Sequence, residues 1–139
     1  MSASDHAAKS YADVGLETAV ASASPHQLIL LLFDGALLAI AKATNAMAQG
    51  QIAEKGEAIS KAIEIITSGL GGSLDFTAGD MLAERLAALY DYMGKRLIHA
   101  NIHNDPAALK EVSFLLGELK SAWEAIGGDP AVVGGRVAA

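Results

Sequence analysis

The sequence has 139 residues, of which 52% are hydrophobic and only 5% aromatic, and it contains no cysteine. This length suits one domain that buries a core without disulfides or cysteine-ligated zinc. The net charge of −6 argues against nucleic acid or an anionic membrane as the main partner, because both attract clustered Lys and Arg. Residues 1–10 lack a signal-peptide pattern. The most apolar stretch, residues 28–41, contains Asp34 and is too short to span a bilayer. We therefore expect a soluble, cytoplasmic protein without membrane insertion.

Residues 1–23 carry only weak patterning, and we expect them to form an N-terminal arm with a short helix near Tyr11. At the other end, residues 127–139 are small and Gly-rich, which predicts a flexible C-terminal tail. The folded part should therefore span residues 24–126.

Two strong helix starts lie within this part. Ser24 can cap a helix, Pro25 suits its first turn and Gln27 completes a capping box. Asp105 as cap, with Pro106 at the first helical position, forms the second start. Apolar residues recur with the 3.6-residue period between such boundaries. The predicted helices cover residues 25–49, 52–69, 80–103 and 106–126. The last one carries an apolar seam at Leu109, Val112, Leu116, Leu119, Trp123 and Ile126.

Short connections join the predicted helices, and no strand pattern competes with them. Residues 71–79 are expected to form a loop with Leu74 and Phe76 packed inward. The sequence therefore predicts an all-α fold: an antiparallel up-and-down four-helix bundle with an extra N-terminal arm or short helix.

The first predicted helix has more apolar surface than one packed face requires. Opposite its core stripe, four leucines flank Asp34: Leu30, Leu31, Leu37 and Leu38. Phe114 falls on the polar side of the last helix, and Ile65 is a borderline case on the second. Either the arm or the 71–79 loop covers these residues, or they form a groove for an amphipathic partner helix. Burial of the first helix against a second copy of the chain is a further alternative.

Chemistry-bearing residues are sparse. His99 and His103 share a helix face at a spacing that can bind a metal, but no zincin-type Glu lies between them. Both fall in the last turn of the third helix, where a cationic side chain suits the helix dipole. His26 has no neighbouring Lys, which argues against a phosphotransfer bundle. We expect no catalytic site, cofactor or metal, and a metal-binding bundle using His99 and His103 is the weaker alternative.

Five short motifs occur in order along the chain. They are residues 17–29 with 32–36, Ser73-Leu74-Asp75-Phe76, residues 89–93, residues 96–105 and Leu119-Lys120-Ser121-Ala122-Trp123. In sequence and spacing they resemble the FliS family of flagellin export chaperones, and the resemblance covers about residues 11–126.

The resemblance implies a non-enzymatic, cytoplasmic type III export chaperone. Such a protein binds the disordered C-terminal segment of flagellin, prevents premature polymerisation and assists delivery to the flagellar export gate. The resemblance assigns Tyr11, in the arm, to docking at the gate, and it leaves a homodimer without client open. Tyr90 and Tyr92 are weaker partner-binding candidates that could instead pack at bundle edges with their hydroxyls in water. The candidate partner-binding residues are Leu30, Leu37, Leu38, Ile65, Tyr90, Tyr92 and Phe114.

Overall fold

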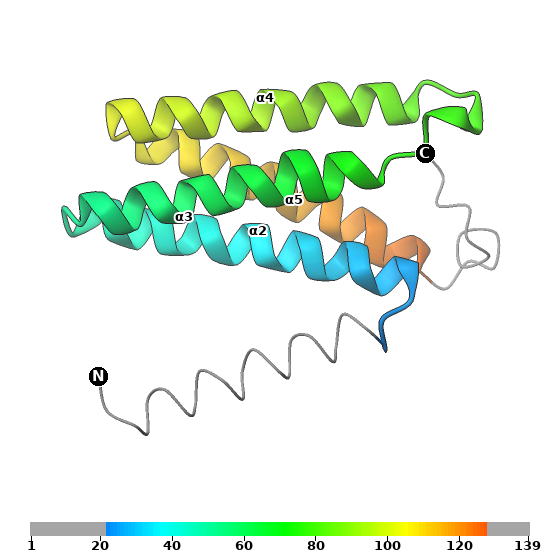
Figure 1. The fold of residues 1–139 in the computed structure, drawn as a ribbon, viewed down its shortest axis with the longest axis horizontal. Helices are drawn as coiled ribbons and strands as arrows, with labels where there is room; N and C mark the ends of the chain where they lie inside the picture. The colour runs from blue at the N-terminus through cyan, green and yellow to red at the C-terminus, as the bar shows by residue number, and fades with distance from the viewer. Residues whose placement is uncertain (1–21, 128–139) are drawn as a thin grey trace.

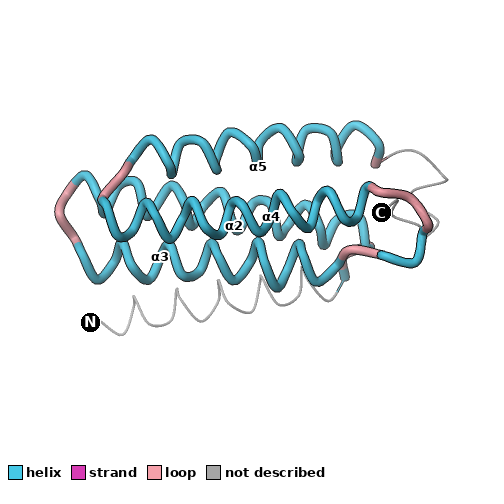
Figure 2. The backbone as a smooth tube through the Cα atoms, turned by 90° about the horizontal axis from the view of Figure 1, so that it is seen from above, coloured by secondary structure: helices cyan, strands magenta, loops and turns pink. Residues whose placement is uncertain are grey.

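The computed structural model describes residues 22–127, which form four long helices and no strand (Figure 1). The helices are α2 (Pro25–Ala48), α3 (Ile52–Glu64), α4 (Leu82–His103) and α5 (Pro106–Ile126). Each helix packs on its neighbours in sequence, and α5 returns to pack on α2, which closes the bundle (Figures 1 and 2). The predicted all-α bundle is confirmed. The predicted arm and tail lie almost entirely outside the described residues.

The predicted helix starts have the expected hydrogen bonds. The Ser24 hydroxyl accepts the backbone N–H of Gln27 at 3.2 Å, and the Gln27 side chain accepts the backbone N–H of Ser24 at 3.0 Å. At the start of α5, the Asp105 carboxylate accepts the backbone N–H of Ala107 at 3.0 Å. These side chains satisfy N–H groups that have no partner within their helices. Local sequence therefore fixes where α2 and α5 begin.

The second predicted helix is not α-helical to its end. Regular α3 stops at Glu64, and the chain continues as a π-helical segment, η1 (Ile65–Leu70). Two short 3-10 turns follow, η2 (Gly71–Ser73) and η3 (Phe76–Ala78). A Cβ added to Gly69 would lie 3.1 Å from Leu32 Cδ2, so the missing side chain permits close approach of η1 to α2.

Of the two side chains predicted to pack inward from the loop between η1 and α4, one does so. Leu74 is half-buried and packs against the core, as expected. The expectation for Phe76 was wrong, since 58% of this residue is exposed. Phe76 begins the η3 turn, which Asp75 caps through the backbone N–H of Thr77, and this turn leaves the ring in solvent.

One charged side chain is buried among the described residues. Lys55 of α3 is 5% exposed, and its ammonium donates to the backbone carbonyl of Asn101 at 3.0 Å and to the side-chain oxygen of Asn104. Asn104 is the left-handed residue (φ 49°) that ends α4. Lys55 therefore caps the carbonyl end of α4, where a cation suits the helix dipole.

Candidate functional site

The apolar seam predicted for α5 becomes partly exposed toward the C-terminal end of this helix. Leu109, Val112 and Leu116 are fully buried in the first part of α5. Beyond them, Leu119 and Trp123 are only half-buried and Ile126 is 38% exposed. In Figure 1, α5 lies beside α4 where it begins and diverges from α4 toward the start of α2. The core is therefore open at this end.

A groove with a volume of about 1540 Å³ occupies this opening and continues between α2 and α3. We call it the α2 groove. Small-molecule pockets typically measure about 300–1,000 Å³, so this one suits a peptide segment better. Its lining recurs on α2 with helical spacing, at Leu28, Leu31, Gly35, Leu38, Lys42 and Asn45. At 1.5 Å per residue, this stripe is about 25 Å long.

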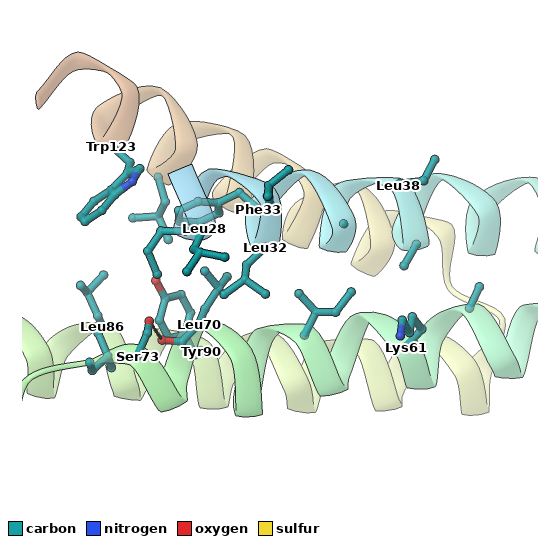
Figure 3. Close-up of a pocket in the computed structure, with 18 of the residues that line it drawn as sticks. Leu28, Leu32, Phe33, Leu38, Lys61, Leu70, Ser73, Leu86, Tyr90 and Trp123 are labelled. Carbon is teal, nitrogen blue, oxygen red and sulfur yellow. Dashed lines mark hydrogen bonds between the residues drawn. The ribbon is translucent and has the colours of Figure 1, made fainter. Parts of the chain in front are cut away.

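The two ends of the α2 groove differ in polarity. At the open end, Trp123 and Leu86 lie on opposite sides of the opening, with Leu28 and Leu32 between them (Figure 3). Toward the α2–α3 turn the lining becomes polar and charged, with Lys42, Asn45, Gln51, Glu54, Glu57 and Lys61. An amphipathic segment with an apolar end and a charged end would therefore match this groove in one direction only.

The π-helical segment shapes the wall opposite α2. In an α-helix, residues five apart point about 140° away from one another. A π-helix joins residue i to residue i+5, so residues five apart lie almost above each other. Ile65 and Leu70 have this separation, and both line the groove. Segments of this kind occur often at functional sites, and here it adds a second apolar side chain to the wall.

Three of the sequence-predicted residues line the α2 groove: Leu38, Ile65 and Tyr90. Leu38 is 58% exposed, which leaves most of its surface available to a partner. Tyr90 is 5% exposed, and burial raises the pKa of its hydroxyl to about 12. Most of the residue is therefore buried in the bundle, and it contributes to the groove wall; its role in partner binding stays a prediction.

The groove does not include Leu30 or Leu37. Both are half-buried, and Leu37 packs against the core. Asp34 lies between them on α2 and bonds to the ammonium of Lys120 on α5 at 2.7 Å. Contact between α2 and α5, which a wheel for a single helix cannot show, thus reduces the free surface on this side of α2.

Tyr92 and Phe114 also lie outside the groove. The Tyr92 hydroxyl donates to the Glu111 carboxylate, which the Arg96 guanidinium also contacts at 2.8 Å. These two hydrogen bonds, from Tyr92 and then Arg96, hold the pKa of Glu111 below its ordinary value. Phe114 is 64% exposed, as its place on the polar side of α5 predicted. A role in partner binding stays a prediction for both. Tyr11, assigned to docking at the export gate, lies outside the described residues.

Leu86 and Trp123 were missed because the sequence pattern assigns both to the core. Leu86 and Trp123 belong to apolar stripes, and both are in fact only partly covered. The spacing of Leu28, Leu31 and Leu38 was the one available signal, since these residues share a helix face with Lys42.

The histidine pair makes contacts that do not require a metal. His99 Nε2 lies 3.1 Å from the carboxylate of Asp105, and the His99 and His103 rings are 4.6 Å apart. Partial burial acts to raise the pKa of Asp105, but hydrogen bonds from His99 and from two backbone amides outweigh it and lower this pKa. Within residues 22–127, no group of three or more His, Asp or Glu side chains is arranged to hold a metal ion.

In the described part of the chain, α2 alone is long and apolar enough to cross a bilayer, by length and composition only. The sequence expectation considered residues 28–41, whereas the continuous helix has 24 residues. Core helices of soluble proteins meet the same criterion. Only 28% of the most apolar window of α2 is buried, and several of its uncovered leucines line the groove. The apolar surface of α2 that is not buried in the core therefore forms part of the groove.

These features define a class of protein, a helical bundle with an open, peptide-sized apolar groove. The family model described as flagellar protein FliS matches residues 7–130. The chain is 51% identical over 118 residues to the flagellar secretion chaperone FliS of Salmonella typhimurium LT2, covering 85% of this chain and 87% of that protein. It is 49% identical over 120 residues to the flagellar secretion chaperone FliSB of Pseudomonas aeruginosa, covering 86% and 94%. Identity to Bacillus subtilis FliS is 34% over 110 residues, covering 78% and 79%. The chain belongs to the FliS family.

Proposed function

We propose that this protein is a cytoplasmic chaperone for flagellar export. It binds the disordered C-terminal segment of flagellin, prevents premature polymerisation and assists delivery of flagellin to the export gate. Its similarity to proteins named flagellar secretion chaperones supports an export substrate as partner. The observation that carries the proposal is the α2 groove, whose size and apolar end suit a helical peptide segment.

Coupled folding and binding accounts for the energetics. A segment that is disordered alone must be ordered on binding, at a cost of about 2–5 kcal/mol or more. Each Leu or Ile side chain that becomes fully buried contributes roughly 1.5–3 kcal/mol. The groove offers Leu28, Leu31, Leu32 and Leu38 along a single helix. A handful of contacts to them is therefore sufficient for tight but reversible binding, as release at an export gate requires.

The groove also limits how the client binds. A helix in contact with the whole α2 stripe of about 25 Å would contain about 17 residues. Its apolar end would contact the region around Trp123 and Leu86, and its charged end would lie near Lys42 and Lys61. We expect the client segment to be amphipathic along its length as well as around its axis.

Calorimetric titration with a peptide from the C-terminal end of the same organism's flagellin tests the proposal. We expect one-to-one binding with a large negative heat-capacity change, because apolar surface becomes buried. The control peptide has the same length, with its leucines and isoleucines replaced by serine, and should not bind.

Absence of binding by the unmodified peptide, with the chaperone folded, would contradict the proposal. Light scattering of the client-free protein then tests the alternative, in which the groove is buried between two copies of the chain. A stable dimer that dissociates when Leu38 is replaced by aspartate would assign the groove to contact between two copies of the chain.

A further inference from the structure

A reciprocal pair of hydrogen bonds joins the start of α2 to the end of α5, at the apolar end of the groove. His26 Nε2 lies 2.9 Å from the backbone carbonyl oxygen of Trp123. A carbonyl oxygen only accepts, so Nε2 is the donor. In return, the Trp123 indole N–H donates to the backbone carbonyl of His26 at 3.0 Å. The two rings stack with centroids 5.0 Å apart and an angle of 9° between their planes.

Gly127 lies against the same imidazole. A Cβ added to Gly127 would come within 2.4 Å of His26 Cε1 and 2.6 Å of Nε2, closer than real Cβ contacts. The backbone of Gly127 has φ −64°, which any residue adopts. The requirement for glycine is therefore steric and comes from the His26 ring. We call His26, Trp123 and Gly127 the clasp.

The clasp coincides with the groove wall. Trp123 lines the groove, together with Pro25 and Leu28 from the start of α2 and Ile126 from the end of α5. Tryptophan carries a large apolar surface and is enriched among residues that dominate binding energy. Trp123, like Leu119, is only partly covered by the core, so the position of the indole depends on the contacts that His26 supplies.

We propose that His26 is a positioning residue for client binding. Together with Gly127, it holds the Trp123 indole in the groove wall and so sets the surface on which the apolar end of the client packs. The role in client binding rests on the proposed function above, whereas the positioning of Trp123 does not.

Two glycine-to-alanine variants test the positioning, one at the residue that follows α5 and one within α5. Gly127→Ala introduces the clash with His26, whereas the methyl group of Gly117→Ala meets nothing within 4 Å beyond its own stretch of helix. Because the chain contains one tryptophan, its fluorescence reports on the clasp alone. In the client-free protein, we expect Gly127→Ala and His26→Ala to shift the emission maximum and increase quenching by acrylamide, with Gly117→Ala like wild type. Unchanged emission and quenching in Gly127→Ala would refute the proposal that contact with His26 holds the Trp123 indole in place.

A double-mutant cycle separates direct contact from general damage. In a His26→Ala background the added methyl group meets no ring, so Gly127→Ala should change neither fluorescence nor affinity further. Additive effects of the two substitutions would show that Gly127 acts elsewhere, and would refute the contact.

Titration with the flagellin C-terminal peptide tests the role in binding. We expect Gly127→Ala and His26→Ala to weaken binding roughly tenfold, the loss expected for a binding contact of intermediate importance, while Gly117→Ala leaves the affinity unchanged. Altered fluorescence with wild-type affinity would overturn the role of His26 in binding. If the wild-type protein itself fails to bind, the proposed function fails, and the role of His26 in binding fails with it. The fluorescence results would still decide whether the clasp holds Trp123.

Discussion

Replacing Leu38 by aspartate tests the α2 groove at its most exposed leucine. Leu38 lines the groove, and 58% of the residue is in contact with solvent. Because it contributes little to the core of the free protein, we expect the stability of the client-free chain to change by less than about 1 kcal/mol. The effect on client binding should be much larger.

The magnitude follows from the exposed fraction. Full burial of a leucine contributes roughly 1.5–3 kcal/mol, and a client that covers the remaining 58% of Leu38 would gain about 1–1.7 kcal/mol of this. Leu38→Ala should therefore weaken binding about fivefold to twentyfold. Aspartate adds the cost of removing a carboxylate from water, which reaches several kcal/mol. We expect Leu38→Asp to weaken binding at least about a hundredfold.

Calorimetric titration with the flagellin peptide measures this loss, and circular dichroism checks that helix content and melting temperature are retained. The matched control is Ile102→Asp on α4, since Ile102 is 68% exposed and lies outside the groove. Its affinity should equal that of wild type. The reasoning is refuted if folded Leu38→Asp binds as wild type does, or if Ile102→Asp weakens binding equally. Phe114→Asp, measured alongside, tests the separate prediction that Phe114 contacts the client.

Three further substitutions test the bundle. Lys55→Met removes the buried cap of α4 and should lower the free energy of unfolding in urea by about 1.5–3 kcal/mol, the range for a hydrogen bond to a charged group; unchanged stability would show that water replaces the ammonium. Burial raises the pKa of Tyr90 to about 12. The protonated hydroxyl therefore contributes fully to the free energy of unfolding below pH 10, and this contribution is lost as the pH rises toward 12. Tyr90→Phe should therefore lose less stability than wild type over that range in unfolding measured at each pH, and equal losses would contradict this. Gly69→Ala places a methyl group 3.1 Å from Leu32 and should lower the melting temperature, whereas Gly56→Ala, with open space around it, should raise it slightly.

The bundle could be predicted because its determinants are local. The capping box at Ser24 and the Asp105–Pro106 start use residues within one helical turn, and the structure contains both. The 3.6-residue period is also read from short segments. Even the end of the second helix was placed within one residue, at Gly69 rather than Leu70, although its geometry was not foreseen.

The groove depends on contacts between residues far apart in sequence, and these a helical wheel cannot supply. Leu37 was expected on a free surface, but it packs against the core. Trp123 was assigned to the seam, yet α5 ends beside α2 and leaves the indole in the groove wall. Ile65 was a borderline case because a wheel at 100° per residue does not apply within the π-helical segment.

The distribution of side-chain sizes on α2 links fold to function. Four of its six buried residues are alanines: Ala36, Ala39, Ala43 and Ala46. Its larger leucines Leu28, Leu31 and Leu38 are less buried, and they line the groove beside Ala39 and Ala46. A helix that served stability alone would place its largest apolar side chains in the core, because the stabilisation grows with the apolar area buried. A pattern that scores residues only as apolar or polar treats alanine and leucine alike and cannot show this difference. In α2, small residues allow close packing within the bundle while larger leucines line the groove, so under the proposed function a bound client would complete the burial that folding leaves unfinished.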